Sequence, residues 1–313
     1  MDLLKTLQEF KPQTKTITLK TYVQNLGKLK REIDNLPIEN LDFLKNKNKV
    51  DEFLEKYTNN SQRNYLNAII VSLQANDMDQ DLIDKYKKDR DDLAKEYREG
   101  KVVGKMNDKE KEGIISFETW DKLINKLEKQ IVANKLKKST DLDKGDFNIL
   151  LRHLILTLYR KYPLRNDYHN VKIITRRESK KKLAKDMNYL IVSPTNMEFI
   201  ISDYKTNKIY DDIEFRVNKA TQKVIRMFLK KSKNTDFLLT DFNGKEFTSN
   251  RLTKFIQNTF NDLIGKKIGS SMLRKSYLSG KYGNTQKEMM KDAKMMGHTV
   301  KVAQEVYTKQ DVE

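Results

Sequence analysis

The chain has 313 residues, of which 34% are charged and 37% hydrophobic, and it carries a formal net charge of +18 with a pI near 9.6. It contains no cysteine, which excludes disulfides, thiolate zinc sites and a cysteine nucleophile. A positive surplus this large favours a polyanionic partner, most often nucleic acid. The alternative is a solubilising, lysine-rich surface of the kind that an A/T-rich genome encodes.

The chain shows no targeting or membrane signal. Its first residues, MDLLKTLQEFKPQTKT, contain no long apolar core and no small-residue cleavage site, so we expect no signal peptide. No apolar run approaches the roughly 20 residues that span a membrane. We therefore expect an intracellular protein with no membrane partner. If it comes from a virus or mobile element, as its A/T-rich-looking composition suggests, it acts in the host cytoplasm or nucleus.

The first 100 residues show the apolar spacing of helices and no strand pattern. In ITLKTYVQNLGKLKREI, for example, apolar side chains recur every three or four residues. We predict a helical domain over residues 1–100 with four helices, near 17–33, 50–57, 59–75 and 79–100. The polar, glycine-containing stretch KVVGKMNDKEKEGI, residues 101–114, predicts a linker; the alternative is a surface loop inside one domain.

Residues 115–313 combine helices with a few short strands. DFNILLRHLILTLYRKY is apolar on most faces, which predicts a buried helix, and Trp120 in the helix before it is expected to anchor the packing. YLIVS, EFIISDY and IYDDIEFRV (residues 189–193, 198–204 and 209–217) have the pattern of strands. The predicted fold class is therefore mainly α with a small antiparallel β-sheet.

Familiar cofactor motifs are absent from the sequence. There is no GxxxxGK[ST] phosphate-binding loop and no HExxH metal motif, and the chain has only three histidines. We read His153 as structural and His169 as exposed. We therefore expect no cofactor and no metal.

Two arginines stand in unusual apolar surroundings. Arg165 in YPLRNDY follows the buried helix, and Arg274 lies in the helical stretch SSMLRKSYLS. A guanidinium in such a place is costly unless an anion compensates its charge, and for either arginine alone an internal carboxylate would suffice. Further along the chain stand the pair Gly297-His298 and then Tyr307, nine residues after the histidine.

Taken in order, these residues resemble the motifs of the tyrosine recombinase (phage integrase) family. The resemblance covers residues 115–313 and, more weakly, residues 1–100, which look like the core-binding domain of such enzymes. It implies a site-specific DNA recombinase or integrase that acts as a tetramer on two DNA duplexes. The catalytic residues it implies are Arg165, Lys205 in a β-hairpin, Arg274, His298 and Tyr307.

The residue types suit phosphoryl transfer without metal or ATP. Two guanidiniums can pair with phosphate oxygens and stabilise the charge of a five-coordinate transition state. A tyrosine hydroxyl can attack phosphorus and form a covalent intermediate, by resemblance a 3′-phosphotyrosine. Lys205 is a plausible acid for the departing 5′ oxygen, with Lys208 as its rival in the same turn.

The sequence departs from the family pattern at two positions. Ser271 stands where the family has the histidine of its His-x-x-Arg box, and Tyr168 stands where it often has a carboxylate. Ser271 and the neighbouring Asp167 are therefore candidate supporting residues; Asp167 could instead cap a helix. Two alternative functions follow: a catalytically degenerate DNA-binding protein of the same fold, or a tyrosine-dependent DNA-relaxing topoisomerase.

Helical geometry sets a condition on the last segment. Nine residues at about 100° each place two side chains on opposite faces of one helix, so a continuous helix cannot direct His298 and Tyr307 at one phosphate. We therefore predict a break at Gly297, with Thr299 as the N-cap of a short helix that carries Tyr307.

Overall fold

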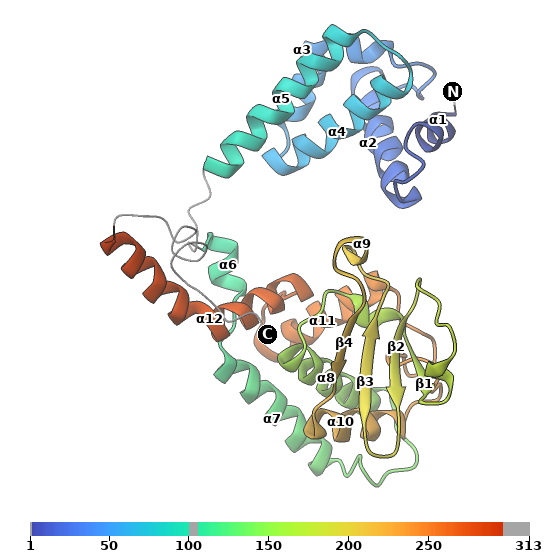
Figure 1. The fold of residues 1–313 in the computed structure, drawn as a ribbon, viewed down its shortest axis with the longest axis vertical. Helices are drawn as coiled ribbons and strands as arrows, with labels where there is room; N and C mark the ends of the chain where they lie inside the picture. Colours follow the sequence, from blue (N-terminus) through green and yellow to red (C-terminus); the bar gives the residue numbers. More distant parts are fainter. Residues whose placement is uncertain (1, 100–105, 297–313) are drawn as a thin grey trace. The chain divides into compact units, whose positions relative to one another are not determined.

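The computed structural model describes residues 2–99 and 106–296, and the chain forms two compact units. The first unit covers Met1–Lys105 and the second covers Met106–Glu313 (Figure 1). Each has its own hydrophobic core, as expected of separate folding domains. Among the described residues, no helix is long and apolar enough to cross a membrane.

The first unit is built of helices. They are α1 (Leu3–Phe10), α2 (Thr16–Asp34), the 3₁₀ turn η1 (Asp42–Lys45), α3 (Lys47–Glu55), α4 (Asn59–Ala75) and α5 (Gln80–Glu99). The four predicted helices are confirmed. Helix α1 was not predicted because its buried face consists of only two residues, Leu3 and Leu7, although Asp2 caps it through the amide of Lys5 at 3.1 Å.

Helix α4 is the centre of this unit. Seven of its residues are buried, and it contacts α1, α2, α3 and α5. A buried hydrogen bond joins α5 to η1: the Tyr86 hydroxyl donates to the Leu44 carbonyl at 2.7 Å. Burial in this unit is therefore concentrated on its central helix.

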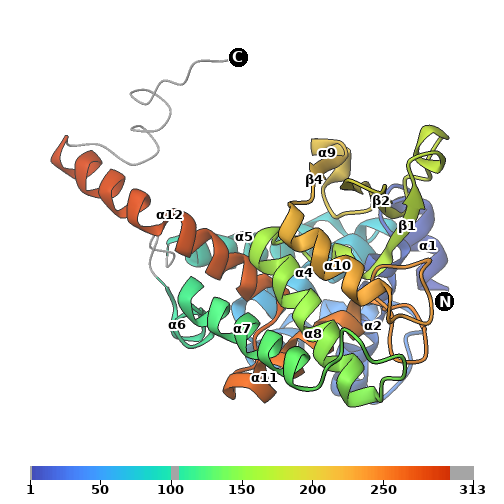
Figure 2. The ribbon, with the colours of Figure 1, turned by 90° about the horizontal axis from the view of Figure 1, so that it is seen from below.

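The second unit packs helices against one small sheet (Figures 1 and 2). Its helices are α6 (Asp108–Gly113), α7 (Phe117–Ala133), α8 (Lys144–Lys161), α9 (Asn207–Tyr210), α10 (Lys219–Leu229), α11 (Ser249–Ile264) and α12 (Ser270–Met295), with 3₁₀ turns η2 (Asp167–Asn170) and η3 (Glu178–Lys180). The fold class predicted from the sequence, mainly α with a small sheet, is confirmed.

Part of the predicted linker 101–114 is helical. Asn107 and Glu110 form a capping box at the start of α6, each side chain accepting from the other's backbone amide. Glu110 also pairs with Lys275 of α12. The cap and this ion pair explain why a polar stretch without an apolar face forms a helix here.

The sheet has the strand order β1-β2-β3-β4, from β1 (Val171–Thr175), β2 (Asn188–Val192), β3 (Met197–Ile201) and β4 (Ile213–Arg216). β3 pairs antiparallel with both neighbours, but β1 runs parallel to β2, so the sheet is mixed and not purely antiparallel. The parallel pair requires a crossover, which residues 176–187 supply. The sequence prediction missed β1 because its five residues lack a clear alternation.

The two faces of the sheet pack on different neighbours. Leu190 and Phe199 belong to the main core with the helices. The alternate residues Tyr189, Ile191 and Ile200 face the other way, against Leu183 and its neighbours from the crossover segment. This alternation is expected, because successive side chains of a strand point to opposite faces of the sheet.

The connection from β3 to β4 is longer than predicted. The sequence predicts a strand from residue 209, but Asn207–Tyr210 form the single turn α9 and β4 begins only at Ile213. Asp211 has a φ of 54°, outside the strand region, which ends any strand at that point. Lys205 thus lies on the β3–β4 connection, exposed to solvent, just before α9.

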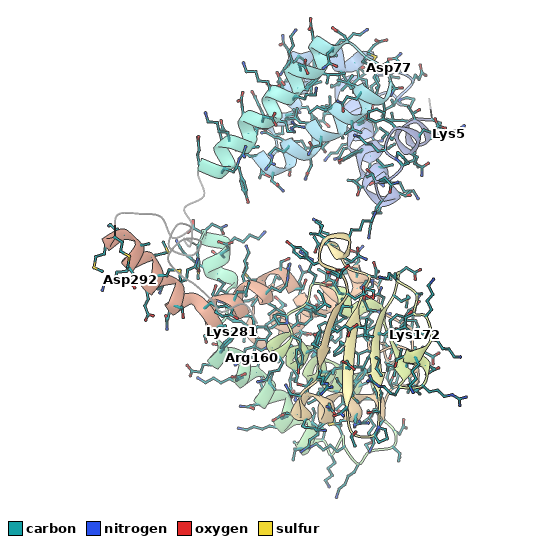
Figure 3. All side chains as sticks on the ribbon, viewed as in Figure 1. Lys5, Asp77, Arg160, Lys172, Lys281 and Asp292 are labelled. Atoms are coloured by element: carbon teal, nitrogen blue, oxygen red, sulfur yellow. The ribbon has the colours of Figure 1, made fainter. Side chains whose placement is uncertain are left out.

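Helix α8 forms the buried axis of the unit, with ten buried residues. The Trp120 ring of α7 is fully buried, and its indole N–H donates to the Leu156 carbonyl of α8 at 3.2 Å, which confirms its predicted anchoring role. Arg160 of α8, which is labelled in Figure 3, donates to the carboxylate of Asp121 on α7 at 2.9 and 3.1 Å. Trp120 and Arg160 together lock α7 against α8.

Candidate active site

The Arg165 loop is held by two buried tyrosines. It joins the end of α8 to η2, and the Tyr159 hydroxyl donates to the Arg165 carbonyl at 2.6 Å. The Tyr168 hydroxyl donates to the Tyr162 carbonyl at 2.7 Å, and the Tyr159 and Tyr168 rings meet edge to face at 5.4 Å. Burial raises the pKa values of both hydroxyls, so they remain protonated donors. The loop is therefore rigid where it presents Arg165.

A second anchor connects this loop to α11. The Asn166 amide nitrogen lies 2.6 Å from the Thr253 Oγ1 and 3.2 Å from the Ser249 carbonyl. Because α11 itself packs in the main core through Leu252 and Ile256, the loop is fixed from both sides.

Arg274 lies in the second turn of α12, within electrostatic reach of Arg165. Burial, together with the positive charge of Arg165, lowers the pKa of Arg274, while Asp167 and Tyr159 oppose this shift. Its Nη2 lies 3.4 Å from the Ser271 Oγ, a long contact, and its Nε is buried without a partner among the described residues. Two guanidiniums that are 109 positions apart in sequence, 165 and 274, are thus close enough to repel each other.

Asp167 is a carboxylate on which the charges of both arginines act. Burial raises the pKa of Asp167, while the backbone N–H of Arg165 and the charges of Arg165, His169 and Arg274 lower it. The structure therefore places Asp167, predicted as a supporting residue, beside both arginines. Tyr168, by contrast, is 0% exposed and packs against Phe199 in the core.

His169 was read from the sequence as exposed, and this is wrong. The residue is half-buried, its Nδ1 lies 2.7 Å from the Asn166 carbonyl, and its charge acts on Asp167. The error arose because a 3₁₀ turn, η2, folds the histidine back toward the loop that precedes it. His153, read as structural, is buried as expected.

Asn188 couples the Arg165 loop to the Lys205 segment. This fully buried residue starts β2, and its Nδ2 lies 2.8 Å from the Asp167 carbonyl and 3.2 Å from the Asp203 carbonyl. Its Oδ1 accepts from the amides of Ser202 at 3.0 Å and Asp203 at 2.8 Å. Sequence reasoning did not find Asn188, because a buried asparagine has no signal in a strand pattern.

Lys205 follows directly from this anchored segment. Its neighbour Tyr204 is buried, donates to the Asp211 carbonyl at 2.5 Å, and lies within the electrostatic reach of Arg165. The Lys205 side chain itself is exposed, as is that of its rival Lys208. The charge of Arg165 thus acts on the residue before Lys205, and both lysines are exposed to solvent.

The remaining predicted residues fall in two groups. Ser271 lies on the first turn of α12, exposed, with only the long contact to Arg274. His298 and Tyr307, with Gly297 and Thr299 of the predicted break, lie outside the described residues. Helix α12 ends at Met295.

The electrostatics of this cluster favour an anion. The charges of Arg165 and Arg274 both act on Asp167, whose pKa is raised by burial. Neither arginine makes a direct ion pair with a carboxylate of the described chain. A bound tetrahedral anion would relieve the repulsion and satisfy the guanidinium forks. The described residues hold no group of three or more side chains that could ligate a metal ion.

We expect Asp167→Asn to keep or slightly raise the free energy of unfolding at neutral pH. The folded-state pKa of Asp167 is raised above its usual 3.8, so the native state binds the proton more tightly than the unfolded chain. The wild type therefore loses stability as pH rises from 3.8 through the folded pKa, and the asparagine variant lacks this loss. Urea unfolding between pH 3 and pH 7, as a difference between the two proteins, measures it.

The contrary outcome is equally clear. If Asp167→Asn is less stable than wild type at pH 7 and the difference shrinks on acidification, the carboxylate is a net stabilising ion-pair partner. Glu198→Gln is a matched control, because this carboxylate of β3 pairs with the exposed Arg176 and does not belong to the candidate site.

Comparison with known proteins yields structural similarity alone. No protein-family model matches the sequence, and no curated protein matches it. Among solved structures, the chain is similar to XerA recombinase at 13% identity and a TM-score of 0.34, over 99% of this chain and 94% of that one. It is also similar to XerH site-specific recombinase bound to its difH substrate in a pre-cleavage complex, at 13% identity and a TM-score of 0.34, over 80% of this chain and 67% of that one.

Proposed function

We propose that this protein is a DNA strand transferase, a site-specific recombinase or integrase that cuts and rejoins DNA through a 3′-phosphotyrosine. The observation that supports this most is the electrostatic coupling of Arg165, Arg274 and Asp167, from two distant segments, in which two guanidiniums face a single carboxylate. The net charge of +18 supplies the general attraction to DNA phosphates.

In this proposal each residue has one role. The Tyr307 oxygen attacks the scissile phosphorus, its proton passes to a base, and the bond to the 5′ oxygen breaks. Lys205 gives that oxygen a proton, while Arg165, Arg274 and His298 bind the non-bridging oxygens. A 5′ hydroxyl then attacks the phosphotyrosine, and the tyrosine leaves, so the phosphodiester is restored without ATP or metal.

Ser271 motivates a second candidate, a DNA-binding protein that does not cleave. Its hydroxyl stands next to Arg274 where the resembled family has an imidazole, and its 3.4 Å contact is weak. Such a protein would bind duplex DNA through the same arginines and form no covalent bond.

A suicide-substrate assay with Tyr307→Phe tests the proposal. We expect the wild type to form a covalent adduct with a pool of nicked duplexes of randomised sequence, and Tyr307→Phe to form none. The adduct is measured as a shifted band on a denaturing gel. Tyr282→Phe is the matched control, because Tyr282 is an exposed tyrosine on α12, and its adduct yield should equal that of the wild type.

Three other outcomes would redirect the assignment. An adduct that persists in Tyr307→Phe would reject Tyr307 as the nucleophile. Salt-sensitive binding with no adduct in the wild type would favour the non-cleaving protein. Relaxation of supercoiled plasmid without a required site would favour the DNA-relaxing topoisomerase.

A further inference from the structure

A concave groove lies in the second unit, between α7 and α10, with α8 as its floor. It encloses about 720 Å³, within the range of about 300–1,000 Å³ that is usual for ligand sites. Figure 2 shows the three helices on one side of the unit. None of the residues that line the groove belongs to the candidate active site.

The groove is apolar inside. Ile131 and Val132 of α7 face Val224 and Met227 of α10 across it. Val132 is 64% exposed, whereas Leu127 and Ile131 of the same helix are buried. A strip of this kind is left open to water only where something covers it or where the chain tolerates the exposure.

The rim of the groove is positively charged. Only one carboxylate lines it, that of Glu128, and within the described chain none of the basic rim residues pairs with a carboxylate. Two of them are already fixed in place, because Arg226 donates to the Ser193 carbonyl at 2.6 Å and Lys231 donates to the Ser139 carbonyl at 2.5 Å. The basic residues of the rim are Lys137, Lys223, Arg226, Lys230 and Lys231.

The single carboxylate of the rim, that of Glu128, contacts His153 on the floor of the groove. Glu128 lies 3.2 Å from the Nε2 of His153, and burial lowers the pKa of His153, so the ring is neutral near pH 7. A neutral ring that faces a carboxylate with Nε2 donates from that nitrogen, which leaves Nδ1 as an acceptor without a partner among the described residues. Because the neutral ring leaves Glu128 its negative charge, this carboxylate can offset only one of the five cations of the rim.

We propose that this groove binds an acidic amphipathic helix of a partner protein. An apolar strip between two helices accepts the apolar face of a third helix, with anchors spaced three and four residues apart. The unpaired cations on both sides of the strip would meet carboxylates that flank those anchors. Duplex DNA fits less well, because its phosphates would contact the rim and leave the apolar floor uncovered. This proposal does not depend on the DNA-cleaving function.

Fluorescence anisotropy with a model peptide tests the proposal on the full-length protein. The probe is a fluorescein-labelled helical peptide with leucines at i, i+3, i+4 and i+7 and glutamates beside them. A scrambled peptide of the same composition lacks the apolar face. At physiological salt we expect the ordered peptide to bind and the scrambled peptide to bind about tenfold more weakly, since rim charges alone are screened.

Two groove variants and one matched variant decide where the peptide binds. We expect Met227→Glu, and separately the pair Lys223→Glu and Lys230→Glu, to weaken binding about tenfold or more. Lys254→Glu makes the same charge change at an exposed position of α11 and should leave the affinity unchanged. Circular dichroism of each variant checks that the helices are intact.

The opposite results would overturn the proposal. Equal binding of ordered and scrambled peptides would mean that only charge is sensed. Equal loss in Lys254→Glu would mean that the groove is not the site. A short DNA duplex that displaces the peptide, and whose own binding is abolished by the Lys223→Glu and Lys230→Glu pair, would make this groove a DNA contact.

Discussion

Arg274→Ala is expected to reduce formation of the covalent DNA adduct by about 100- to 1,000-fold, the usual effect of removing one donor that stabilises transition-state charge. The Arg274 Nε is buried without a partner among the described residues, and burial together with the positive charge of Arg165 lowers the pKa of Arg274. The guanidinium is therefore held ready in the absence of an anion and is not used in a structural ion pair. Its removal should leave the unfolding free energy little changed or slightly higher.

Two further variants separate the effect of the Arg274 guanidinium's shape from that of its positive charge. Arg274→Lys keeps the charge and loses the planar fork, so we expect it to recover DNA binding but little of the cleavage rate. Lys275→Ala removes a cation from the adjacent position of α12, where it pairs with Glu110, and should change adduct formation only a few-fold. Single-turnover adduct formation at saturating DNA measures both. If Lys275→Ala and Arg274→Ala lost activity equally, Arg274 would act only through general attraction.

The helices of both units were predictable because burial follows the helical period. In α2 the buried residues Leu19, Leu26 and Leu29 are spaced seven and three residues apart, about two turns and one turn of a helix, and α8 is apolar on most faces. The two arginines were predictable for a related reason. A charge inside an apolar helical stretch conflicts with local burial, and such conflicts mark sites where an outside partner is needed.

The sheet and the supporting contacts were less predictable because they depend on residues distant in sequence. β1 forms a strand mainly because it pairs with β2. Its residues, among them the exposed Lys172, do not alternate regularly between buried and exposed positions. Asp167 was predicted by its place beside Arg165, but the Asp167 charge environment requires Arg274 from α12. His169 was misread because its contact is with a backbone carbonyl, which no side-chain pattern reports.

Asn188→Ala is expected to destabilise the second unit by about 3 kcal/mol, because buried backbone groups left without partners cost about 1–3 kcal/mol each. The variant loses the acceptor of the Ser202 and Asp203 amides and the donor to the Asp167 carbonyl. Urea unfolding followed by circular dichroism measures the loss. Asn196→Ala is the control, because Asn196 is exposed and, among the described residues, its side chain makes one long hydrogen bond, at 3.4 Å from Lys219.

A loss of stability alone would not show that Asn188 positions the candidate site, so a local measurement is needed. Because Asn188 bonds to both segments, we expect hydrogen exchange to quicken at the amides of Ser202 and Asp203 in Asn188→Ala under conditions where the unit stays folded. Asn188→Asp keeps the acceptor for these two amides and loses the donor to Asp167. It should therefore preserve their protection while still lowering adduct formation. If protection at Ser202 and Asp203 fell equally in both variants, the side chain would serve the general packing of β2, and the coupling between the Arg165 loop and the Lys205 segment would have to run through another residue.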